Sequence, residues 1–166
     1  MWLRRFFQLL TVLLLVAAIA LAYHRFHRTP AELELRQYVE FEVPGLTAAE
    51  APIRQGIASL LRAPGLSITQ ARQLLVDDLM PRLVALHKMS NPRFARSPDV
   101  QQLKAEYTAI IDRLIESCRR CIHLIDDPKA DGAKQFRHFQ DELQAVTEAF
   151  TAWSHHVQVV YQRKRR

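Results

Sequence analysis

The sequence predicts an all-α protein, in which an N-terminal transmembrane helix precedes an elongated antiparallel helical bundle that ends in a long C-terminal helical hairpin. Three observations predict this fold class. Residues 6–23 form an uncharged apolar run, helix-capping sequences precede most later segments, and two long apolar seams recur at helical spacing. Because 166 residues suit one domain with an appendage, we divide the chain into an anchor at 1–28, a helical bundle domain at 29–162 and a basic tail at 163–166.

The anchor is predicted from the segment FFQLLTVLLLVAAIALAY, residues 6–23. It contains no charged side chain and just reaches the minimum length of a membrane-spanning helix. Trp2 and Tyr23 stand where interfacial aromatic residues belong, and arginines bracket the run on both sides. We therefore interpret residues 1–28 as an uncleaved signal anchor that places the chain in the lipid bilayer.

A cleaved signal peptide is the alternative, because Ala20-Leu21-Ala22 resembles a cleavage site. The apolar run is long for such a peptide, and Arg25 and Arg28 directly after the cut would hinder translocation. A short N-terminal tail with two arginines normally stays in the cytoplasm. The expected location is therefore a bacterial inner membrane with the body in the periplasm, or the periplasm itself if the chain is cleaved near Ala22.

The net charge of +6 is concentrated at the two ends of the chain. Four arginines flank the apolar run and four basic residues form the tail; removing these eight from the 23 basic residues leaves 15, against 17 acidic residues, in 29–162. A nucleic-acid-binding domain needs a basic excess in its folded part, so nucleic acid is not an expected partner. The basic ends suit anionic lipid headgroups, although a solvated terminus is the alternative for the tail.

Capping boxes at Thr29 (TPAE) and Thr47 (TAAE) predict two helix starts. Residues 33–43 alternate between apolar and polar like a strand, but no partner strand is obvious, so we predict a short helix with an extended end at 43–45. The second helix is predicted over 48–62, with four apolar residues inward: Ile53, Ile57, Leu60 and Leu61.

A third helix is predicted from a cap at Ser67, over residues 68–89, with a kink at Pro81. Its inward stripe consists of Ile68, Leu75, Leu79, Leu83 and Leu86. A loop follows, and Ser97 before Pro98 predicts the cap and first residue of the next helix.

The strongest pattern predicts a helical hairpin over 98–125 and 133–162, joined by the turn sequence DDPKADG. Both helices carry apolar residues at three- and four-residue spacing, as in a coiled coil. These residues are Val100, Leu103, Tyr107, Ile110, Leu114, Cys118, Cys121 and Ile125, then Phe136, Phe139, Leu143, Val146, Phe150, Trp153, Val157 and Val160. The short turn makes the helices antiparallel, and the earlier helices are expected to cover their apolar face.

Both cysteines lie in SCRRCIH, residues 117–123. A covalent haem site would need a histidine where Ile122 stands, and a thioredoxin-like pair would need Cys118 at a helix N-terminus. We therefore interpret Cys118 and Cys121 as buried core residues. A disulfide between them, or a metal site completed by His138 on the return helix, is the alternative.

Catalytic and cofactor motifs are not found. The four glycines cannot build a phosphate-binding loop, and no nucleophile elbow, HExxH or Walker sequence occurs. We therefore expect neither an enzyme nor a cofactor, and no small-molecule substrate can be identified.

The expected function is that of a single-pass membrane-anchored accessory subunit that binds other proteins of an envelope complex, or its own copies, through helical faces. The docking surface is predicted at Trp153, Val157, Val160 and Tyr161, unless other helices cover it. The alternative function is a periplasmic redox- or metal-responsive adaptor that uses Cys118 and Cys121.

The layout of an apolar start, a VPGL segment and long antiparallel helices resembles periplasmic stress and metal-resistance adaptor proteins built as helical hairpins. Arg36 and Glu40 stand where such metal sensors place histidines. The resemblance therefore implies no ligand set for this chain.

Overall fold

A computed structural model describes residues 13–19, 29–62, 67–91, 95–127 and 132–165, and these residues contain no strand. Residues 13–19 are helical. The elements that follow are α2 (Pro30–Gln37), η1 (Tyr38–Glu42), α3 (Val43–Arg62), α4 (Ile68–Gln73), η2 (Leu74–Leu79), α5 (Met80–Met89), α6 (Pro98–Asp126) and α7 (Gly132–Arg165), where η denotes a π-helical segment. The all-α prediction is confirmed for the described residues.

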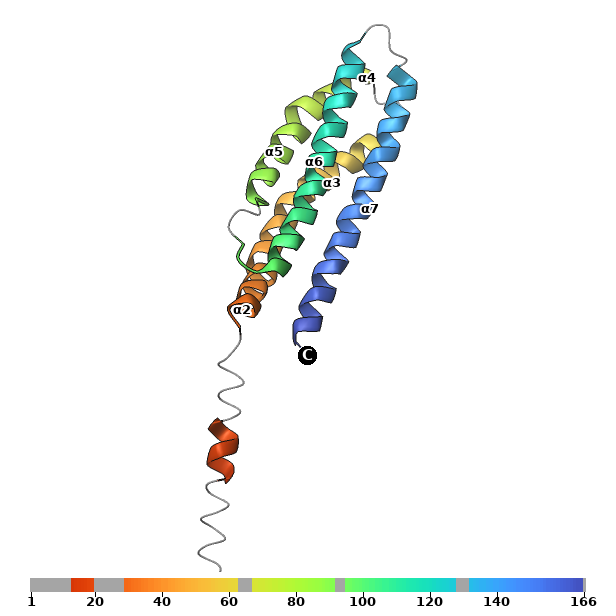
Figure 1. Cartoon of the computed structure of the whole chain (residues 1–166). Coiled ribbons are helices and arrows are strands. Elements are labelled where there is room, and N and C mark those ends of the chain that lie inside the picture. The colour runs from red at the N-terminus through yellow and green to blue at the C-terminus, as the bar shows by residue number, and fades with distance from the viewer. Residues whose placement is uncertain (1–12, 20–28, 63–66, 92–94, 128–131, 166) are drawn as a thin grey trace, which may run out of the picture.

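The domain is an elongated up-and-down bundle (Figure 1). The segment α2–η1–α3 runs away from the N-terminal end, α4–η2–α5 returns, α6 runs outward again and α7 comes back. α6 and α7 pack against each other along their length, while α5 contacts both α3 and α6, and α3 also contacts α7. The predicted antiparallel hairpin is therefore the spine of the bundle, and the earlier helices cover its apolar face.

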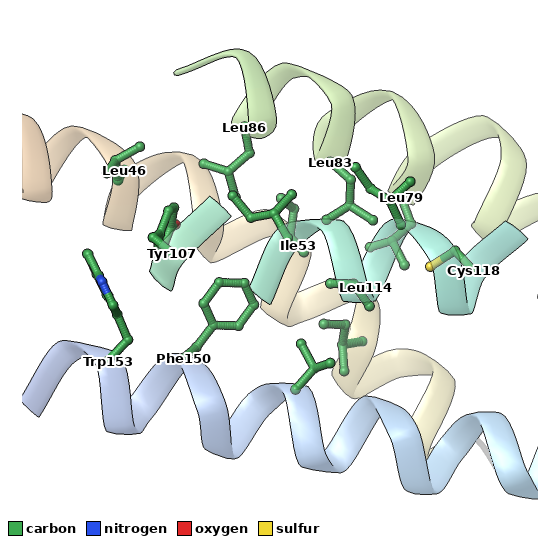
Figure 2. Packing of buried hydrophobic residues seen from close by; sticks show 14 of the residues in the cluster. Leu46, Ile53, Leu79, Leu83, Leu86, Tyr107, Leu114, Cys118, Phe150 and Trp153 are labelled. Carbon is green, nitrogen blue, oxygen red and sulfur yellow. The ribbon is translucent and has the colours of Figure 1, made fainter. Parts of the chain in front are cut away.

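Six of the eight predicted seam residues of α7 are buried: Phe139, Leu143, Val146, Phe150, Trp153 and Val157. Phe136 and Val160, at the two ends of the seam, are half-buried. Figure 2 shows Phe150 and Trp153 in the core. The buried stripe of α6 is wider than the predicted seam. Ile111 is fully buried, whereas the predicted seam residues Ile110 and Ile125 are half-buried. Because α6 packs against α5 on one side and α7 on the other, it buries a broader face than a two-stranded coiled coil would.

The predicted extended segment at 43–45 is wrong, because α2, η1 and α3 form one continuous helix from Pro30 to Arg62. Its start agrees with the sequence. The N–H of Glu32 donates to Oγ1 of Thr29 at 3.3 Å, and the glutamate carboxylate accepts the threonine N–H in return. The alternating apolar residues of 33–43 do not share one face of this helix: Leu35 is buried, whereas Leu33 and Phe41 are exposed.

The predicted helix start at Thr47 is also wrong. This residue lies inside α3, and its hydroxyl donates to the carbonyl of Val43 at 2.9 Å instead of capping an N-terminus. Glu50, the other member of the predicted capping box, is buried in the core. The TAAE sequence therefore does not mark a helix start here, because its glutamate bonds to Tyr107 and Arg54 instead of to the backbone N–H of Thr47.

Pro44 and Pro81 are each preceded by a π-helical segment that ends two residues earlier. In both, the residue just before the proline donates its N–H to the carbonyl five residues back. A proline ring collides with the carbonyl four residues back in a regular α-helix, and a wider turn relieves this collision. The kink predicted at Pro81 thus takes the form of a π turn, whereas Pro52 lies within α3 without one.

The cap at Ser67 is confirmed, because its hydroxyl accepts the N–H of Gln70. The inward stripe after it needs one correction. Ile68 is 50 % exposed, whereas the other predicted residues of the stripe are buried: Leu75, Leu79, Leu83 and Leu86. Ile68, in the first turn of α4, therefore lies outside the buried stripe.

Ser97 is the N-cap residue of α6 and Pro98 follows it at the start of the helix, as predicted, but the Ser97 side chain makes no capping hydrogen bond. The N–H groups of Arg96 and Ser97 donate instead to the two carboxylate oxygens of Glu34, at 2.7 and 2.6 Å. This carboxylate supplies the acceptors from 63 residues away, and it ties the start of α6 to α2.

The predicted anchor lies mostly outside the described residues. Of residues 6–23, the described part is 13–19, whose large aliphatic side chains are 59–68 % exposed. Within the described ranges, no helix combines the length and the apolar character that crossing a bilayer requires. Of the tail at 163–166, Arg163 and Lys164 are described as exposed residues at the end of α7.

Candidate functional site

The cysteine pair lies in the part of α6 that packs against α7. Cys118 is completely buried, Cys121 is 4 % exposed, and both thiols are free. Figure 2 places Cys118 at the end of the row of buried side chains that includes Leu79 and Leu114. Burial raises the pKa of Cys118 from its ordinary value of 9.0 to about 12 and that of Cys121 to about 11. Both thiols are therefore protonated core groups near neutral pH, which is opposite to the thiolate that redox or metal chemistry needs.

A small hollow of about 160 Å³ opens beside Cys121, between α6 and α7. Its lining includes Cys121 and His138, as the register of the hairpin predicts, together with Ser117, Arg120, Leu124, Phe139 and Glu142. The His138 side chain is 71 % exposed, and its Nε2 lies 3.7 Å from Oε1 of Glu142. The same oxygen accepts a bond from Arg120 at 3.0 Å.

The polar groups of this hollow are therefore engaged with one another. The Glu142 carboxylate is shared between the Arg120 guanidinium and the His138 imidazole. Across the described residues, no three His, Cys, Asp or Glu side chains are grouped so that they could hold a metal ion. Of the candidate set Cys118, Cys121 and His138, Cys121 and His138 line the same hollow, whereas Cys118 is not part of its lining.

Buried thiols should make the domain less stable as the solution becomes alkaline. An unfolded cysteine loses its proton near pH 9, whereas Cys118 and Cys121 hold theirs to about 12 and about 11. The unfolded state therefore binds fewer protons between these values, and the free energy of unfolding falls as pH rises from about 9 toward about 11. Urea unfolding at about pH 8 and about pH 10 should show a smaller fall for Cys118→Ala/Cys121→Ala than for the wild type. An equal fall in both proteins would contradict this role of the thiols.

The predicted docking residues at the end of α7 are mostly covered by their own chain. Trp153 and Val157 are 3 % and 2 % exposed, and Nε1 of Trp153 donates to the carbonyl of Leu103 at 2.9 Å. Val160 and Tyr161 are half-buried. Trp153 and Val157 are therefore not exposed as a docking surface requires, because α6 and the earlier helices cover this face of α7.

A buried polar cluster joins α3, α6 and α7. Glu50 is 3 % exposed; one carboxylate oxygen accepts a hydrogen bond from the Tyr107 hydroxyl at 3.0 Å and the other pairs with Arg54. The Arg54 guanidinium lies 5.6 Å from the centre of the Phe150 ring. The ring of Tyr107 lies 4.3 Å from that of Trp153, centre to centre, and Figure 2 shows these aromatic side chains together. Burial, followed by the charge of Glu50, raises the pKa of Tyr107.

A second polar contact links η1 to α6. Lys104 is 7 % exposed, its Nζ lies 2.6 Å from Oε2 of Glu42, and it sits 5.3 Å from the centre of the Tyr38 ring. The Tyr38 hydroxyl is buried and has no hydrogen-bond partner among the described residues. Burial and the charge of Glu42 raise its pKa. Both polar contacts connect helices to one another, so they serve the packing of the bundle.

The sequence did contain a signal for Glu50. It falls between Leu46 and Ile53 at four- and three-residue spacing, on the stripe that α3 buries. Because TAAE matches a capping box, however, the sequence predicted that Glu50 would cap a helix. Lys104 carried the same kind of signal, because it falls between Val100 and Tyr107 at four- and three-residue spacing, on the stripe that α6 buries.

No protein-family model, curated protein or solved structure matches this chain.

Proposed function

We propose that the protein is a single-pass membrane protein whose helical domain acts, without catalysis of its own, as an interaction or assembly subunit of an envelope complex. One observation carries the membrane part of the proposal. The large aliphatic side chains of 13–19 are 59–68 % exposed, whereas the domain buries its apolar seams almost completely. Clustered exposed aliphatic groups mark a surface that an apolar partner covers. Because these side chains belong to the uncharged run at 6–23, the hydrocarbon of a bilayer is the partner that fits them best.

The proposed location is a bacterial inner membrane with the helical domain in the periplasm. The support is the short N-terminal tail, in which Arg4 and Arg5 precede the apolar run. Release into the periplasm after cleavage near Ala22 is the competing outcome of the experiment below.

The accessory role is supported by what the polar residues of the core do. Glu50 and Lys104, which are buried, each contact groups on a neighbouring helix, so their charges are used in packing. Leu33 and Phe41, 52 % and 73 % exposed on α2 and η1, are available for a partner. The adaptor alternative, in which Cys118 and Cys121 respond to redox state or metal, gains no support from thiols that are buried and protonated.

Membrane attachment predicts that the full chain stays in the membrane fraction after an alkaline carbonate wash and is released by detergent. Intact-mass measurement of the extracted protein should give a chain that still contains residues 1–28. The same extract should contain a partner protein, or a second copy, at a fixed ratio to the chain. A soluble periplasmic protein that begins near residue 23 would contradict the anchor, and a chain extracted intact as a monomer would contradict the assembly role.

A further inference from the structure

The start of α2, the start of α6 and the end of α7 gather at one end of the bundle (Figure 1). The Glu34 carboxylate holds the two N–H groups that precede α6. Nζ of Lys164, near the end of α7, lies 3.1 Å from Oδ2 of Asp99 in the first turn of α6. The Tyr161 hydroxyl donates to Oε1 of Glu40 at 2.9 Å, which joins α7 to η1. The end of α7 is thereby fixed beside the point at which the chain enters the domain.

Among the described residues at this end, Arg163 is a cation whose charge faces outward without an ion pair. Glu34 is occupied by backbone N–H groups, and Asp99 pairs with Lys164. Arg163 is exposed and forms no ion pair with any residue that the structure describes. The sequence continues beyond Lys164 with two more arginines. The described part of the basic C-terminus, Arg163 and Lys164, therefore lies at the same end as the entry of the chain.

We propose that this end of the bundle docks on anionic lipid headgroups through Arg163 and Lys164. The proposal rests on the proposed membrane attachment. The apolar run ends at Tyr23 and the domain begins at Thr29, and the residues between them span at most about 20 Å when fully extended. An anchor at 6–23 thus keeps the end of α7 within reach of lipid phosphates, which attract exposed Lys and Arg side chains.

Anionic lipid is the partner favoured by the position of this basic end next to the proposed anchor. The anchor and the basic end are connected by a few residues, so the bilayer is the polyanionic surface that this end meets in every copy of the protein. The rest of the domain is close to charge balance, with 15 basic and 17 acidic residues in 29–162. The attraction is therefore confined to one end, which orients the long axis of the bundle away from the membrane.

The test uses the full chain reconstituted into vesicles of phosphatidylcholine alone, or with about one third phosphatidylglycerol. A fluorophore on Gln162→Cys, an exposed position, reports energy transfer to a headgroup-labelled lipid, and unmodified protein shows that the buried native thiols do not take the label. We expect stronger energy transfer in the vesicles that contain phosphatidylglycerol than in those of phosphatidylcholine alone. High salt should reduce this difference between the two kinds of vesicle, because it screens exposed charges. Arg163→Ala/Lys164→Ala should weaken docking at least about fivefold, the effect of one exposed basic residue, because the Lys164 charge is already paired with Asp99.

Arg119→Ala/Arg137→Ala is the matched control, since both arginines are exposed near the opposite end of the hairpin. It should leave the lipid dependence unchanged. Flotation in high salt separates the two proposals. A chain that floats with both kinds of vesicle but shows equal energy transfer is anchored without docking, which overturns this inference. A chain that floats with neither kind overturns the anchor, and the docking with it.

Discussion

Phe150→Ala should lower the free energy of unfolding by about 3–5 kcal/mol, the largest single-residue loss expected in this domain. The Phe150 side chain is completely buried, its ring meets that of Tyr107 edge-on at 5.6 Å between centres, and the Arg54 guanidinium lies over it. Truncation removes these contacts and leaves a cavity between α3, α6 and α7 that the surrounding helices cannot fill. Urea unfolding followed by circular dichroism measures the loss.

Phe41→Ala is the matched control, because it removes the same side chain from a position that is 73 % exposed. Its effect on the free energy of unfolding should stay within about 0.5 kcal/mol. Equal losses in the two variants would mean that Phe150 is not part of the core. A loss confined to Phe150→Ala would confirm the seam of α7 as the centre of the bundle.

Glu50→Ala should lower the free energy of unfolding by about 3 kcal/mol. The substitution leaves the Tyr107 hydroxyl buried without its acceptor and removes the partner of Arg54. Glu50→Gln keeps an oxygen acceptor for the hydroxyl, so its loss should be smaller. Both variants are measured by urea unfolding at neutral pH.

Glu116→Ala supplies the comparison for Glu50→Ala, since Glu116 is an exposed acid of α6 and its loss should cost about 0.5 kcal/mol or less. A double-mutant cycle with Tyr107→Phe isolates the hydrogen bond and should return a coupling of about 0.5–3 kcal/mol. A coupling near zero, or a Glu50→Ala variant as stable as Glu116→Ala, would show that the carboxylate does not hold the tyrosine.

The hairpin could be predicted from the sequence because its pattern is long and its turn is short. The seam from Phe139 to Val157 repeats over several turns, and this repeat depends on local spacing alone. The same spacing identified Cys118 and Cys121 as core residues, and the hairpin register brought His138 to the level of Cys121. These features follow from positions along one helix pair, which a single sequence records directly.

Other features depended on partners far away in the chain. TAAE at Thr47 has the composition of a cap, but Glu50 bonds to Tyr107, 57 positions later, and no local pattern carries that information. The covering of Trp153 depends on how the remaining helices close around α7. Proline also gives an incomplete signal, since Pro44 and Pro81 follow π turns, whereas Pro52 does not.

The continuous helix from Pro30 to Arg62 has a mechanical consequence. Its 33 residues extend for about 50 Å at 1.5 Å per residue, so it forms a stiff rod along much of the bundle. A tilt or axial rotation applied at Thr29 is transmitted along this rod to the opposite end, near α4. Thr29, where the chain enters the domain, and the far end of the bundle near α4 are thus joined by a single helix.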